Sequence, residues 1–233
     1  DYSLPDMTGR TILQVIPDLS AGGAERTVIE MAEAIVMAGG EALVASRGGR
    51  LEGALTDAGG KLIEMNAKSK NPFVLQANTG KLVKLIRERS VRLVHARSRA
   101  PAWSAMAAAN KANIPFETPY HGAYSGKSAL KIRHNSVMAR GDIVIANSEW
   151  TAAHVRDVHG VDPTNLVTIP RGVGLDVFAP SAVSPERIEA ARAAWRLDGP
   201  EGISPLVLLL PARLTDWKGH RVASEAGSRL SRE

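Results

Sequence analysis

Cysteine is absent from the 233-residue sequence, which excludes disulfide bonds, thiolate zinc sites and cysteine nucleophiles. Long apolar runs are absent too. No segment approaches the roughly 20 apolar residues that a membrane-spanning helix needs, and residues 1–10 hold no apolar stretch like that of a signal peptide. The absence of cysteine fits a reducing compartment, and the absence of long apolar runs argues against a membrane-spanning helix or a signal peptide. We therefore expect a cytoplasmic protein.

Aromatic residues make up only 4% of the chain, and only Phe73 lies within its longest basic run. A surface that stacks nucleic-acid bases needs aromatic side chains among its cations, so we expect no nucleic-acid partner. The G-x-G-x-x-G fingerprint is missing, which argues against a nicotinamide-dependent oxidoreductase. The six histidines show no H-E-x-x-H or other metal-binding spacing, so we expect no metal and no cofactor.

The net charge of +5 is unevenly distributed. Between residues 68 and 99 there are nine Lys or Arg and one acidic residue, and between 125 and 140 there are four and none. Such a basic face is a solvated surface, or it binds anionic lipid or a phosphorylated acceptor. In segment 81–88 the cations Lys81, Lys84 and Arg87 lie opposite an apolar stripe, which favours peripheral attachment to an anionic membrane.

Short apolar runs alternate with helical periodicity along the chain. The pattern predicts helices over residues 20–40, 73–89, 101–111 and 149–160, and strands over 11–17, 41–46, 61–65, 91–96, 114–120, 141–148 and 165–170. In the first helix the apolar stripe is Val28, Met31, Ala32, Ile35 and Val36. Strands separated by helices of this length predict an α/β fold with a parallel sheet covered on both faces.

A domain boundary is indicated by four prolines within residues 178–205. We expect a first domain over 8–180, a linker with a short helix over 181–204, and over 205–233 the first strand and helix of a second α/β domain. The run LVLLLPA at 206–212 is apolar throughout, as in strands buried on both faces. No later strands follow to cover it, so it would dock on the first domain, pair with another copy or stay an exposed edge; self-association is one expected consequence.

Three loops carry candidate chemistry. Gly22 and Gly23 separate the first strand from the first helix, where backbone N–H groups can approach an anion, or simply form a tight turn. His121 follows a strand at its carboxyl end, where open α/β sheets bind ligands, although a histidine in a loop is commonly only that. Arg213 and Lys218 suit a diphosphate, or are two exposed cations beside a buried tryptophan.

Five motifs in order over residues 11–220 resemble the family 4 glycosyltransferases: GGAER, HGAY, IANSEWTAAHV, IPRGVGLDVF and PARLTDWKGH. The nearest resemblance is to bacterial members that build lipopolysaccharide and other cell-surface glycans. The resemblance implies two Rossmann-like domains, a nucleotide-sugar donor, a glycan or lipid-linked acceptor, retention of anomeric configuration and no metal. A sugar-nucleotide epimerase shares this architecture but is not expected to show PARLTDWKGH in this form.

The resemblance also implies roles for single residues. His121 would hydrogen-bond the donor sugar, Arg213 and Lys218 would hold the donor diphosphate, and Gly22 and Gly23 would lie near the donor phosphate or the acceptor. Further contacts to the acceptor or within these loops are expected from Glu25, Arg26 and Lys127.

Two departures from the family pattern follow. The family reads Asn-Gly-Val-Asp where this chain has Arg171, Gly172, Val173 and Gly174. Most of the family's second domain would follow His220, so we expect the 233-residue chain alone to have little or no transferase activity. The alternative function is a non-catalytic acceptor-domain fragment that binds lipid or a partner.

Overall fold

The computed structural model describes residues 4–20, 22–69, 71–122, 128–197, 206–212 and 214–230. The chain divides into two compact units, Asp1–Arg171 and Gly172–Glu233. Residues 172–180, which the sequence analysis assigned to the first domain, therefore belong to the second unit. No residue of helix α7 (Leu175–Phe178) is buried.

The first unit is built on a seven-stranded sheet whose paired strands are all parallel, in the order β3-β2-β1-β4-β5-β6-β7. The predicted α/β class is confirmed, and each predicted strand of this unit forms. The strands are β1 Thr11–Val15, β2 Glu41–Ser46, β3 Lys61–Glu64, β4 Val91–Ala96, β5 Phe116–Tyr120, β6 Ile143–Ala146 and β7 Leu166–Thr168.

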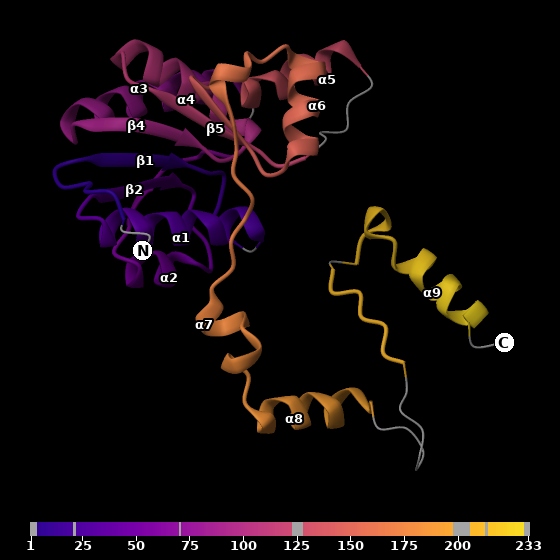
Figure 1. Cartoon of the computed structure of the whole chain (residues 1–233). Helices are drawn as coiled ribbons and strands as arrows, with labels where there is room; N and C mark the ends of the chain where they lie inside the picture. The colour runs from indigo at the N-terminus through magenta and orange to yellow at the C-terminus, as the bar shows by residue number, and fades with distance from the viewer. Residues whose placement is uncertain are drawn as a thin grey trace. The chain divides into compact units, whose positions relative to one another are not determined.

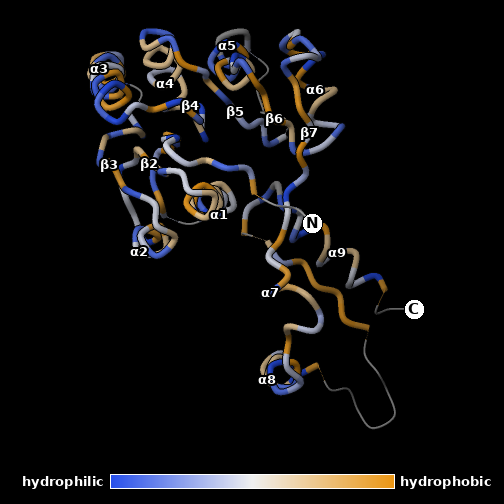
Figure 2. The backbone as a smooth tube through the Cα atoms, turned by 60° about the vertical axis from the view of Figure 1, so that its left-hand side comes forward, coloured by the Kyte–Doolittle hydropathy of each residue, from blue (hydrophilic) through white to orange (hydrophobic). Residues whose placement is uncertain are grey.

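Helices cover both faces of the sheet (Figures 1 and 2). On one face lie α1 (Gly23–Met37) and α2 (Glu52–Asp57); on the other lie α3 (Pro72–Glu88), α4 (Arg99–Ala112), α5 (Ala129–Asn135) and α6 (Glu149–His159). The long helices match the predicted ranges, whereas α2 and α5 were not predicted. Two turns or fewer of helix give too few residues for an apolar period to show in the sequence.

Each face has its own core. On the α1 face Val28, Ile29, Ala32 and Ile35 pack against the sheet. The predicted stripe is wrong at Met31, which is 37% exposed. On the opposite face Ala102, Ala105, Ala108 and Ala109 of α4 are fully buried, and their small side chains let α4 lie close to β4 and α3.

The second unit contains α7, α8 (Pro185–Trp195) and α9 (His220–Leu230) among its described residues. The strand predicted over 206–212 is wrong: the described residues there form no strand, and the side chains of 206–210 are 44–84% exposed. A strand forms only by pairing, and no described segment of this unit offers a partner. Among the helices that the structure describes, none combines the length and hydropathy needed to cross a bilayer.

Candidate functional site

The strand order reverses at β1, whose neighbours are β2 on one side and β4 on the other. In an open parallel sheet, ligands bind beyond the carboxyl ends of the strands at such a reversal. The loops that leave β1, β4, β5 and β7 at this edge carry Gly22, Arg97, His121 and Arg171 respectively. These four loops form the candidate site.

The loop before α1 depends on its two glycines. Gly22 has φ of 145°, and a Cβ there would lie 2.6 Å from Oε2 of Glu25; α1 also starts without a side-chain cap. A Cβ on Gly23 would lie 2.9 Å from Nη1 of Arg171, which donates a 3.1 Å hydrogen bond to the Gly23 carbonyl. Glycine at both positions therefore lets two charged side chains approach the start of the helix.

His121 is a neutral hydrogen-bond donor in this loop cluster. Its Nδ1 lies 3.4 Å from Nη2 of Arg171. Arginine only donates, so Nδ1 accepts and the imidazole proton sits on Nε2. Burial, followed by the positive charges of Arg171 and Arg97, lowers the pKa of His121 to about 4. At neutral pH its Nε2–H can donate to a ligand without adding charge.

A buried polar layer lies beneath this loop cluster. Gln14, His95 and Glu117 are register partners across β1, β4 and β5, and Arg97 follows two residues after His95. Arg97 Nη1 lies 2.9 Å from Nε2 of His95, which puts the His95 proton on Nδ1, 3.7 Å from Oε1 of Glu117. The layer thus runs from a guanidinium through an imidazole toward a carboxylate.

Burial governs the charges in this layer. It lowers the pKa of Arg97 to about 10, and burial followed by the charges of Arg97 and His121 holds the pKa of His95 well below its usual value. Burial also raises the pKa of the Glu117 carboxyl, against the pull of Arg97. His95 is therefore neutral at pH 7, and Arg97 remains a buried cation.

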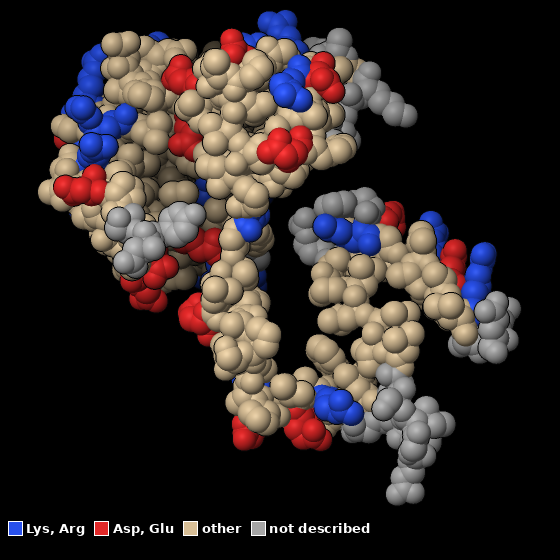
Figure 3. Space-filling view, viewed as in Figure 1, with Lys and Arg blue, Asp and Glu red and all other residues tan. Residues whose placement is uncertain are grey.

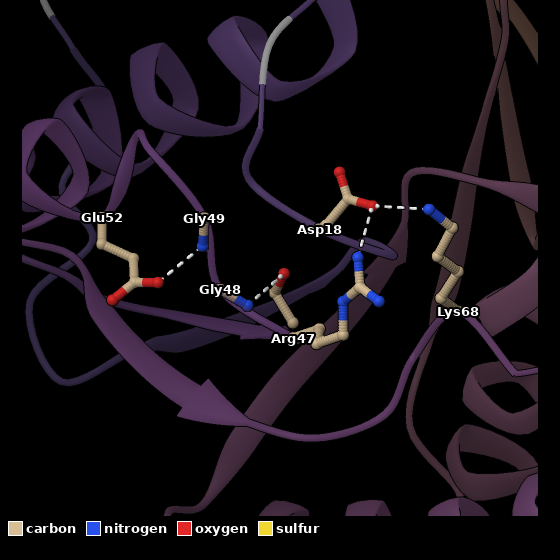
Figure 4. Close-up of polar contacts among 7 residues, drawn as sticks. Asp18, Arg47, Gly48, Gly49, Glu52 and Lys68 are labelled. Carbon is tan, nitrogen blue, oxygen red and sulfur yellow. Dashed lines mark hydrogen bonds and ion pairs between the residues drawn. The ribbon is translucent and has the colours of Figure 1, made fainter.

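A second polar cluster lies at the ends of β1, β2 and β3 (Figure 4). Oδ2 of Asp18 lies 3.3 Å from Nζ of Lys68 and 3.6 Å from Nη2 of Arg47. Although burial acts to raise it, the pKa of the Asp18 carboxyl is lowered by hydrogen bonds from Ser20 and Lys68. Nearby, the Gly49 N–H donates a 2.5 Å bond to Oε1 of Glu52. This cluster connects the loops that follow β1, β2 and β3 at the same edge of the sheet.

The predicted site residues do not all fall at this edge. Gly22, Gly23, His121 and the half-buried Glu25 lie there, and the exposed Arg26 follows on α1. Lys127 and Arg213 lie outside the described residues. Lys218 lies in a short 3-10 helix of the second unit, Asp216–Lys218.

Arg97, Glu117 and Arg171 were missed by the sequence analysis. Arg97 follows β4 as His121 follows β5, so position at a strand end could have identified it. Within the described ranges, no group of three or more His, Asp or Glu side chains is placed to hold a metal ion.

A doubly wound parallel sheet with a glycine-lined helix start at its strand reversal defines a Rossmann-like ligand-binding unit. Residues 21–177 match the model of Glycosyltransferase Family 4, and the chain belongs to this family. No curated protein sequence matches the chain.

Solved structures share the fold. A glycosyltransferase from Rickettsia africae ESF-5 is 38% identical, with a TM-score of 0.81 over 96% of this chain and 58% of that one. Anabaena Alr3699/HepE, solved in complex with UDP and glucose, is 20% identical, with a TM-score of 0.72 over 94% of this chain and 57% of that one. The lipopolysaccharide outer core galactosyltransferase WaaB is 15% identical, with a TM-score of 0.55 over 71% of this chain and 46% of that one. This chain thus spans 58% of the length of the Rickettsia protein.

Proposed function

We propose that this chain is the acceptor-side part of a glycosyltransferase that moves a sugar from a nucleotide-sugar donor to a glycan or lipid-linked acceptor. Family membership supports the reaction class, as does the 38% identity to a glycosyltransferase from Rickettsia. The HepE structure, which holds UDP and glucose, supports a nucleotide-sugar donor. WaaB, named for lipopolysaccharide synthesis, supports a role in building cell-envelope polysaccharide.

The observation that carries the proposal is the neutral His121 beside the Gly22–Gly23 loop. Sugar hydroxyls are neutral, so an uncharged N–H donor binds them without the cost of dehydrating a cation. Arg171 holds the ring through Nδ1 and leaves Nε2–H as the group that meets the donor sugar. Glycine at the adjacent helix start lets the donor phosphate or the acceptor approach the backbone.

Transfer breaks the bond between the anomeric carbon and the diphosphate oxygen, so negative charge develops on the leaving diphosphate. Arg213 and Lys218 would stabilise this charge as a fork and a point charge, without a metal ion. The oxygen of the acceptor hydroxyl then bonds to the anomeric carbon and its proton passes to the leaving diphosphate, with configuration retained as in the enzymes this sequence resembles. These assignments rest on the motif that contains both cations.

We also propose that the protein acts at the cytoplasmic face of an anionic membrane. In α3 the side chains of Lys81, Lys84 and Arg87 are exposed, while Leu82 and Ile86 are buried. Lys and Arg side chains gather on the side of the first unit where α3 lies (Figure 3). A lipid-linked acceptor would be presented at such a surface.

The exposed apolar segment 206–210 favours self-association of the second unit.

The proposal is tested by sugar transfer with the native protein purified from its source. The protein is incubated with UDP-, GDP- and ADP-sugars and a lipid-linked glycan fraction, and the acceptor is followed by mass spectrometry. One nucleotide-sugar is expected to add one sugar with its anomeric configuration kept, as read by NMR. Native protein that binds the glycan fraction but transfers no sugar from any donor would instead be a non-catalytic binding module.

A further inference from the structure

We propose that the edge of the first unit's sheet carries a subsite for an anionic group of the acceptor, formed by the guanidiniums of Arg171, in the loop after β7, and Arg97, in the loop after β4. This inference rests on the proposed function, since it assigns a property to the acceptor. The anionic group is a carboxylate or a phosphate carried by the glycan.

Arg97 is a buried cation that has no ion-pair partner among the residues the structure describes. Its side chain is 5% exposed, and among the described residues no carboxylate oxygen lies within 4.0 Å of it. In the described part of the chain its guanidinium makes one hydrogen bond, from Nη1 to the neutral His95, and Nη2 has no partner. Buried charges are normally paired, and an unpaired one at the edge of a sheet is a feature of binding sites.

Arg171 is also a cation whose hydrogen-bond partners carry no charge, but it lies at the surface. Its two hydrogen bonds go to the Gly23 carbonyl and to Nδ1 of His121, and both acceptors are uncharged. An arginine has five N–H donors, so donors remain for a ligand. In the described residues no carboxylate forms an ion pair with Arg171, although the side chain is exposed to solvent.

The two guanidiniums act on each other. Arg171 contacts the ring of His121 after β5, and Arg97 leaves the neighbouring strand β4. After the larger effect of burial, the positive charge of Arg171 lowers the pKa of Arg97. Glu117 and Glu30 favour the charged form of Arg97, but only from beyond ion-pair distance. An oxyanion bound to Arg171 would relieve the repulsion between the cations and complete the charge balance of the edge.

We assign the anion to the acceptor rather than to the donor diphosphate, because two other cations, Arg213 and Lys218, are proposed to neutralise the diphosphate. The anion would bind at Arg171, whose Nη2 is 3.4 Å from the ring that is proposed to meet the donor sugar. The planar fork of an arginine matches both a carboxylate and a phosphate, so the chemistry of the group is an oxyanion.

The test is anion binding to the 233-residue chain without a donor. Inorganic phosphate and glucuronate are titrated separately at constant ionic strength, with glucose as the neutral control. Binding is followed through the Nε–H resonances of the arginines. Saturable shifts are expected at Arg171 with both anions and none with glucose. The tighter anion identifies the group on the acceptor.

Four variants separate this subsite from general surface charge. Arg171→Gln is expected to weaken anion binding about tenfold, the loss of one charge-assisted contact. Arg97→Gln should weaken binding less, and Arg97→Lys, which keeps the charge, should retain it. Arg47→Gln removes an equal charge at the far end of the same edge and should leave binding unchanged. Because Arg171 is exposed, its variant decides the test even if Arg97→Gln fails to fold.

Equal losses in Arg171→Gln and Arg47→Gln, or no saturable shift at Arg171, would overturn the subsite. Displacement of the bound phosphate by UDP would assign the cations to the donor and overturn the acceptor assignment. Absence of sugar transfer by native protein that still binds the anion would refute the proposed function alone.

Discussion

Acidification from pH 7.5 to 5.0 is expected to destabilise the first unit through His121. Burial and the charges of Arg171 and Arg97 hold its pKa at about 4 in the folded protein, against about 6.5 in an unfolded chain. Between these values the unfolded chain binds more protons than the folded one. The free energy of unfolding therefore falls as the pH falls through this window.

The magnitude follows from the two pKa values. At pH 5.0 an unfolded histidine is almost fully protonated and the folded His121 is mostly neutral, so at most about 2 kcal/mol of stability is lost relative to pH 7.5. His95 adds to this loss, because burial and the charges of Arg97 and His121 lower its pKa too. Glu117 opposes the loss, because burial raises its pKa and protonation then favours the folded state.

The assay is urea unfolding at both pH values, followed through amide resonances of β1, which report the first unit alone. His121→Gln keeps an N–H donor but cannot be protonated, so it should lose about 2 kcal/mol less than the wild type on acidification. Contributions shared by the two proteins cancel in this difference. Equal losses in the wild type and the variant would show that His121 titrates normally, and would refute the account of a neutral donor.

Two further predictions concern the fold and its surface. Gly49→Ala should lower the free energy of unfolding in urea by about 2–4 kcal/mol, because φ of Gly49 is +151° and the new Cβ would lie 2.6 Å from the backbone of Leu19. The control Gly53→Ala in α2 meets no neighbouring atom and should raise the free energy of unfolding by about 0.5–1 kcal/mol. Equal effects of the two substitutions would contradict this prediction. Replacing both Lys81 and Lys84 by Gln should weaken binding to anionic phosphatidylglycerol vesicles, measured by co-sedimentation, by about 1 kcal/mol per lysine. The control Lys111→Gln should leave vesicle binding unchanged. Wild-type binding that is indifferent to anionic lipid would contradict membrane attachment.

The sequence predicted the elements whose burial is visible locally. The long helices of the first unit repeat apolar residues with a helical period, and its seven strands are short apolar runs, so their positions could be predicted. The strand at 206–212 could not be judged this way, because a strand needs a partner and the pairing depends on segments far away in the chain. Met31 was misassigned because a helical stripe fixes a face only to within one residue.

The candidate site was predicted only where a residue stands next to a strand end. Gly22, Gly23 and His121 each lie in such a loop, so position alone identified them. Arg171 reaches Gly23 and His121 from the loop after β7, and the strand order that brings these loops together cannot be read from local sequence. The charge state of His121 likewise depends on burial and on guanidiniums from two other loops.

The most direct test of the central claim is whether sugar transfer by the native protein depends on His121. The values of kcat/KM are compared for the wild type, His121→Gln and His154→Gln, a matched change of a histidine on α6. We expect about a tenfold loss in His121→Gln, the cost of a weakened hydrogen bond to the donor sugar, and wild-type activity in His154→Gln. Equal activity in all three proteins would contradict the claim that this edge of the sheet binds the donor sugar.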